Sequence, residues 1–160
     1  MITLPDLNSI IQVIQLMLAP GLMISACGLL LLGMNNKYSL VVNRIRLLNE
    51  ERRRVALKAG EREFTYEENV RLESISLQID KLTLRVKLVR NAVLSYTIAV
   101  ALFVITSLLI GVQFFASLNF NVIITIIFLL GMLSVLAGVL YAAYETKEGY
   151  SIIQLEVKID

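Results

Sequence analysis

The charged side chains of this 160-residue chain are strongly segregated along the sequence. No charged residue occurs between Asn91 and Tyr144, and none separates Asp6 from Lys37. By contrast, 13 of the 15 Lys and Arg residues lie within Lys37–Arg90. An apolar stretch of about 20 residues can cross the hydrocarbon core of a bilayer as a helix. The segregation therefore predicts an integral membrane protein.

The composition supports this class. Only 18% of residues are charged, against about a quarter in soluble domains, and the mean hydropathy is +0.73. A net charge of +2 gives no reason to expect nucleic acid as a partner. The chain has no His and a single Cys, Cys27, which excludes the usual zinc sites. We expect no cofactor.

We predict an all-α integral membrane fold in one domain, residues 1–160, with three transmembrane helices. The spans are Ile10–Met34, Ala92–Ala116 and Val122–Tyr144, and the polar segment Ser117–Asn121 divides the last two. Cytoplasmic loops carry an excess of Lys and Arg, so residues 37–90 are predicted to be cytoplasmic. The N-terminus and the Ser117–Asn121 turn then face outward, and the tail 145–160 is cytoplasmic.

Residues 37–90 are predicted to form an antiparallel helical hairpin of coiled-coil type. Its first helix is Leu40–Lys58, which Gly60 ends. Thr65 and Glu68 have the spacing of a capping box that starts the second helix. No Gly or Pro occurs between Glu67 and Ile110, which predicts that the second helix is continuous with the second span.

The second helix carries two apolar stripes. The first, named here the inner seam, recurs at four-three spacing and is the candidate oligomer seam: Leu72, Ile75, Ile79, Leu82, Val86 and Val89. Leu77, Leu84 and Leu88 form a second stripe. A helix that is apolar on two sides needs more than one partner. We expect the first hairpin helix to be one partner and a neighbouring subunit to be the other, which predicts a homo-oligomer.

The basic residues near the membrane have two interpretations. They contact anionic lipid head groups, or they only set topology and solvate the surface, which we favour. The candidates are Arg44, Arg46, Arg85, Lys87 and Arg90. Glu50 with Arg54 and Glu67 with Arg71 have the spacing of helical ion pairs. In the tail, residues 152–160 fit a strand by alternation or a helix with Ile152, Leu155 and Ile159 on one face; we favour the helix.

The three spans contain no ionisable carboxylate, amine, guanidinium or imidazole. Pumps and hydrolases depend on such groups, so we predict neither active transport nor an enzyme. Small residues at four-residue spacing predict close helix packing. The candidates are Gly21, Ser25, Ser95, Ala99, Ser134, Gly138 and Ala142.

Polar side chains leave a second possibility open in the first span. Gln12 and Gln15 share a face and either hydrogen-bond across helices or ring a pore entrance, with a mouth at Asn35, Asn36 and Lys37. Pro20 interrupts the helical hydrogen bonds, and with Gly21 it is a candidate hinge, although such kinks are more often static.

Three segments are distinctive: Ala19–Gly28, Asn35–Tyr38 and Val42–Glu51. They resemble a bacterial membrane-protein family known only as a domain of unknown function. In that family a first span ends in an Arg- and Glu-rich helix and two spans follow; Glu145 also fits. The resemblance implies a bacterial inner-membrane location and carries no activity.

These observations predict a non-enzymatic, oligomeric membrane protein whose hairpin serves assembly or docks a cytoplasmic protein partner. The alternative is a homo-oligomeric channel or pore for small ions, because uncharged polar groups suit passive conduction.

Overall fold

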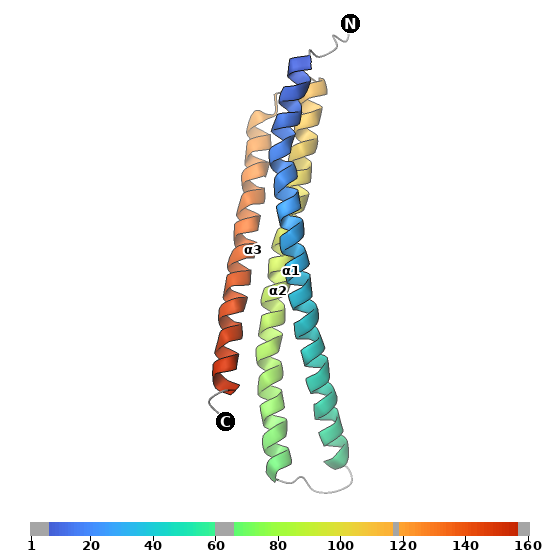
Figure 1. Cartoon of the computed structure of the whole chain (residues 1–160), viewed down its shortest axis with the longest axis vertical. Coiled ribbons are helices and arrows are strands. Elements are labelled where there is room, and N and C mark those ends of the chain that lie inside the picture. The colour runs from blue at the N-terminus through green and yellow to red at the C-terminus, as the bar shows by residue number, and fades with distance from the viewer. Residues whose placement is uncertain (1–6, 60–65, 117–118, 157–160) are drawn as a thin grey trace. The chain divides into compact units, whose positions relative to one another are not determined.

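The structure is a computed structural model that describes residues 7–59, 66–116 and 119–156. These residues form three helices, α1 (Leu7–Ala59), α2 (Tyr66–Ala116) and α3 (Asn121–Glu156) (Figure 1). Each helix contains a stretch that is long and apolar enough to cross a membrane. The prediction of an all-helical chain with three such helices is confirmed.

The helices are longer than the predicted spans. α2 is continuous, so the predicted second hairpin helix and second span belong to one helix. α1 is also unbroken, although we predicted its span and its hairpin helix as separate segments. α3 extends to Glu156, so the helical interpretation of the tail is correct to that residue. The predictions at Gly60, Thr65, Ser117–Leu118 and residues 157–160 lie outside the described residues.

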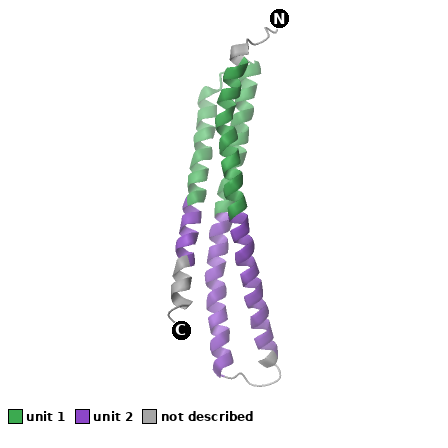
Figure 2. Ribbon diagram, in the orientation of Figure 1, with its two compact units in different colours: residues 1–33, 92–139 green, residues 34–91, 140–160 purple. Residues whose placement is uncertain are grey.

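The chain divides into two compact units (Figure 2). Unit 1 comprises Met1–Gly33 and Ala92–Val139, and unit 2 comprises Met34–Asn91 and Leu140–Asp160. All 15 Lys and Arg residues of the sequence belong to unit 2. The structural division therefore follows the charge segregation of the sequence.

A seven-residue repeat of buried positions runs along each helix. These positions are Cys27, Met34, Val41 and Leu48 in α1 and Gly131, Gly138 and Glu145 in α3. In α2 they are Ile75, Val89, Tyr96 and Phe103, and the half-buried Leu82 occupies the position between the first two. A seven-residue period is typical of helices that pack with left-handed supercoiling. Met34 and Val41 keep this phase on both sides of the polar segment 35–39, which explains why α1 is not interrupted there.

Unit 1 is held together by an aromatic core. Cys27 of α1 packs with Ala99 and Phe103 of α2, and Phe128 of α3 packs against this cluster. The ring centroids of Phe103 and Phe128 are 5.5 Å apart. Gly131 lies against the Phe103 ring, where a side chain would not fit: an added Cβ would be 2.8 Å from Cε1 of Phe103.

Unit 2 contains the second part of α1, the first part of α2 and the end of α3. Arg71 of α2 links the first two of these segments, because its Nη2 donates to Oε1 of Glu51 of α1 at 2.7 Å. The inner seam is covered within the chain: Ile75 and Val89 are fully buried, and Leu72, Ile79, Leu82 and Val86 are half-buried. The chain's own helices therefore cover part of the face that was predicted as an oligomer seam.

Candidate functional site

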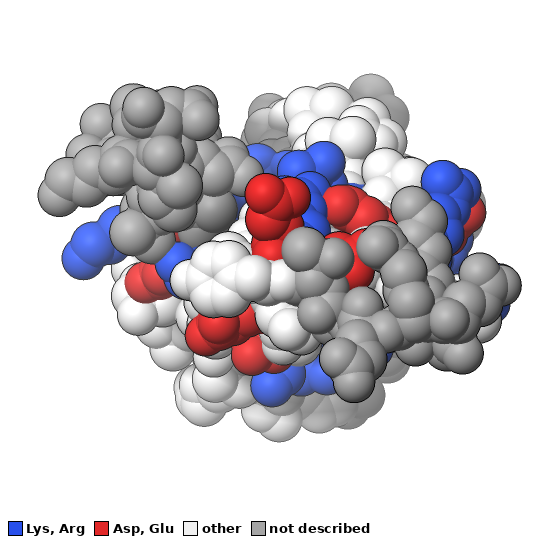
Figure 3. All heavy atoms as spheres, turned by 90° about the horizontal axis from the view of Figure 1, so that it is seen from below, with Lys and Arg blue, Asp and Glu red and all other residues white. Residues whose placement is uncertain are grey.

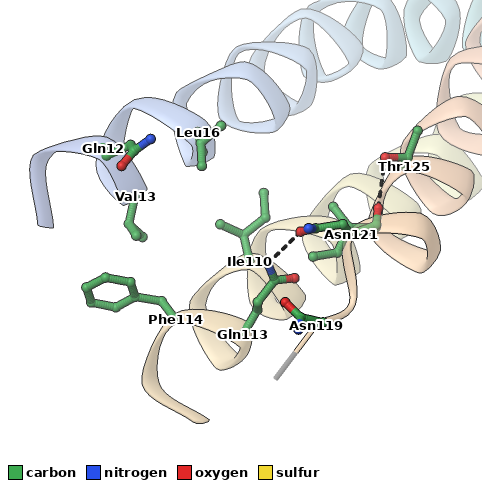
Figure 4. Close-up of a pocket in the computed structure, with 10 residues that line it drawn as sticks. Gln12, Val13, Leu16, Ile110, Gln113, Phe114, Asn119, Asn121 and Thr125 are labelled. Atoms are coloured by element: carbon green, nitrogen blue, oxygen red, sulfur yellow. Dashed lines mark hydrogen bonds between the residues drawn. The ribbon is translucent and has the colours of Figure 1, made fainter. Parts of the chain in front are cut away.

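Unit 1 contains a cleft of about 620 Å³ to which all three helices contribute (Figure 4). Its lining is uncharged and combines carboxamides and a hydroxyl with apolar side chains. The lining residues are Gln12, Val13, Leu16, Ile110, Gln113, Phe114, Asn119, Asn121, Ile124 and Thr125. Such a surface can hydrogen-bond water or an uncharged group, but it offers no acid or base.

The carboxamide of Gln113, which lines this cleft, bonds to residues at the start of α3. Its Nε2 donates to Oδ1 of Asn121 at 2.6 Å, and its Oε1 accepts from the backbone N–H of Phe120 at 3.1 Å. The next helix starts here, since the N–H of Ile124 donates to the carbonyl of Phe120 at 2.9 Å. Gln113 therefore links α2 to the start of α3 with both halves of its amide.

Unit 2 contains a buried ion cluster centred on Glu145 of α3. The Glu145 side chain is 1% exposed. Its Oε1 accepts from Nε of Arg85 at 3.1 Å and from Nη2 at 2.6 Å. Its Oε2 accepts from Nζ of Lys37 at 3.0 Å. Gly149, one turn further along α3, leaves room for the guanidinium, because an added Cβ would lie 3.2 Å from Nη2 of Arg85.

This ion cluster fits a structural role. Lys37, Arg85 and Glu145 come from α1, α2 and α3, so one carboxylate links all three helical segments of unit 2. Both of its oxygens already accept hydrogen bonds from cations. A carboxylate in this state is a poor general base, because proton uptake would break charge-assisted bonds.

The residues predicted as a pore entrance or mouth have different surroundings. Gln12 lines the cleft, whereas Gln15 is exposed and is not part of the lining. Lys37 is paired with Glu145, and Asn35 and Asn36 are exposed.

The candidate head-group contacts also separate. Arg85 is committed to Glu145, while Arg44, Arg46, Lys87 and Arg90 are exposed. Figure 3 shows one face of the molecule, on which basic and acidic side chains are interspersed.

Two helical ion pairs were predicted in the hairpin. The pair of Arg54 with Glu50 is confirmed, with Nη2 and Oε1 2.7 Å apart. Arg71, which was expected to pair with Glu67, donates instead to Glu51.

Most of the candidate packing and hinge residues are buried or half-buried. Ala99 and Gly138 are buried; Gly21, Ser95, Ser134 and Ala142 are half-buried, and Ser25 is exposed. Pro20 is fully buried within α1. The hydroxyls of Ser25 and Ser107 donate to the carbonyls of Gly21 and Phe103, four residues earlier in the same helix.

Sequence reasoning missed the roles of Glu145 and Gln113. The ion pairs of Glu145 join residues 60 and 108 positions apart, so no local spacing indicates them. One signal was present, because Glu145 follows Gly138 by seven residues and continues the buried phase of α3. Among the described residues, no three His, Cys, Asp or Glu side chains group as a metal site requires.

Comparison with known proteins places the chain in a family. No curated protein and no solved structure matches the sequence significantly. A family model described as a protein of unknown function, DUF2721, matches residues 17–155. This range includes the whole Glu145 cluster and Gln113. The predicted resemblance to a domain of unknown function is thereby confirmed: the chain belongs to the DUF2721 family of proteins of unknown function.

Proposed function

We propose that this protein is a non-enzymatic, self-assembling protein of the bacterial inner membrane, and that its hairpin is the element for assembly or for docking a protein partner. One observation carries the proposal: unit 2 exposes large apolar side chains although it holds all the basic residues of the chain. These side chains are Leu40, Leu47, Leu57, Val70, Leu77 and Leu84. Exposed apolar surface outside the bilayer is typical of an interaction site.

The chemistry of the described side chains supports a non-enzymatic role. The most buried carboxylate, Glu145, holds two cations, and the hydroxyls of Ser25 and Ser107 are engaged by their own helices. The cleft in unit 1 has only uncharged polar groups. Neither the Glu145 cluster nor the cleft brings together a nucleophile and a base.

The copy number in lipid tests the assembly. Mass measurement of the full chain in nanodiscs should give a protein mass of at least twice the 17.9 kDa of one chain. The controls are a dilution series in lipid and a monomeric membrane protein of similar size, which exclude crowding of several copies into one disc. A mass of one chain at every lipid ratio would contradict the proposal.

A channel is the second candidate, and the uncharged polar cleft that includes Gln12 is the observation that favours it. The pairing of Lys37 with Glu145 weighs against a mouth built around that lysine. Ion flux in liposomes distinguishes the two functions. Flux that falls when Gln12 is replaced by Leu favours the channel, and an assembled protein without flux favours the assembly role.

A further inference from the structure

One face of α2 in unit 2 is apolar, exposed and regular. Val70, Leu77 and Leu84, named here the outer stripe, are 49%, 58% and 46% exposed. They are seven residues apart, so they lie on one side of the helix. At about 100° per residue, this side is roughly opposite the buried Ile75 and the half-buried Val86 of the inner seam. The chain thus covers one apolar face of α2 and leaves the other uncovered.

We propose that the outer stripe binds the outer stripe of a second copy of this chain, with the two α2 helices parallel. This inference rests on the proposed function and names the surface and the partner. A seven-residue repeat of Leu and Val is the pattern by which helices pair along a seam. Copies inserted in one bilayer with the same topology present their α2 helices in the same direction.

Charges beside the stripe match the parallel pairing. Lys81 lies about 40° to one side of Leu77, and Asp80 lies about 60° to the other side. In a parallel pair the two-fold axis runs along the helices, so each side of the outer stripe faces the opposite side of the partner's stripe at the same height. Lys81 therefore meets the partner's Asp80, and the symmetry repeats this contact. Both side chains are exposed, and neither forms an ion pair among the described residues.

The antiparallel alternative is disfavoured by the same residues. In an antiparallel pair centred on Leu77, each side of the outer stripe faces the same side of the partner's stripe. Glu73 lies on the flank of Asp80 and would then approach the partner's Asp80. Two carboxylates that approach each other repel, whereas the parallel pair brings opposite charges together.

Disulfide cross-linking of the full chain in lipid tests the pairing. With Cys27→Ala as background, Val70→Cys, Leu77→Cys and Leu84→Cys are each expected to give a covalent dimer under mild oxidation. Ser76→Cys is the matched control, because it is exposed and on the same helix but about 100° from the stripe. We expect about tenfold less dimer from it, since distant Cα atoms cannot be bridged. Dimer from only one stripe position indicates an antiparallel pair and overturns the proposal.

Charge variants provide the second arm. In the Leu77→Cys protein, Lys81→Glu is expected to abolish most of the dimer, and adding Asp80→Lys to that variant is expected to restore it by exchanging the two signs. Circular dichroism checks that the variants remain helical. If the exchange fails to restore the dimer in a helical protein, the parallel register is wrong.

The outcomes separate this inference from the proposed function. Several copies in a nanodisc without cross-links at the outer stripe would overturn the stripe and leave self-assembly in place. A single copy in the nanodisc would overturn both.

Discussion

Gly138→Ala is expected to lower the free energy of unfolding by about 2–3 kcal/mol through overpacking. An added Cβ would lie 2.6 Å from Cε1 and 2.8 Å from Cδ1 of Tyr96. The Tyr96 ring is buried and cannot swing aside, so α2 and α3 must separate within unit 1. Alanine normally favours a helix over glycine, and a loss of stability would therefore report the close contact and not helix propensity.

The single cysteine of the chain provides the measurement. Cys27 is buried in the core of unit 1, and a thiol-reactive dye labels it only when that core opens. On heating, Gly138→Ala should label at a midpoint roughly 5–10 °C below the unsubstituted protein. Gly111→Ala is the matched control, because a Cβ at Gly111 meets nothing within 4 Å. An equal loss in both variants would show that the contact with Tyr96 is not the cause.

Arg85→Met is expected to cost about 3 kcal/mol, because it leaves the buried Glu145 carboxylate with Lys37 alone. The Arg85 side chain is 26% exposed and Lys37 is 45% exposed, so we place the cost at the low end for buried pairs. Lys37 keeps one of the two carboxylate oxygens satisfied.

The double variant Arg85→Met with Glu145→Leu should recover most of this loss. Removing both buried partners eliminates the desolvated carboxylate, and the half-exposed Lys37 can be hydrated by water. Thermal unfolding followed by circular dichroism in lipid measures both effects. If the stability loss of the double variant equals the sum of the losses of the single variants Arg85→Met and Glu145→Leu, the ion cluster is not coupled.

The sequence predicted the elements of this fold better than their contacts. The uncharged stretches and the absence of Gly and Pro between Glu67 and Ile110 sufficed to predict three long apolar helices and the continuous α2. The continuity of α1 was missed because the polar Asn35 and Asn36 suggest an end. The seven-residue phase from Met34 to Val41 would have indicated an unbroken helix.

The two apolar stripes of α2 show what sequence patterns alone cannot predict. Both stripes have helical spacing, so periodicity alone does not say which one the chain itself covers. The structure buries Ile75 and Val89 and exposes Leu77 and Leu84. The Glu145 cluster was out of reach for a related reason, because its partners approach only after all three helices of unit 2 pack.

The assembly proposal depends on a cytoplasmic position of residues 37–90, and reporter fusions test that position most directly. Alkaline phosphatase, which is active only outside the cytoplasm, should be active when inserted after Asn119 and inactive when inserted after Ala59. A fluorescent protein that folds only in the cytoplasm should give the opposite pattern. Phosphatase activity after Ala59, together with inactivity after Asn119, would contradict the cytoplasmic hairpin.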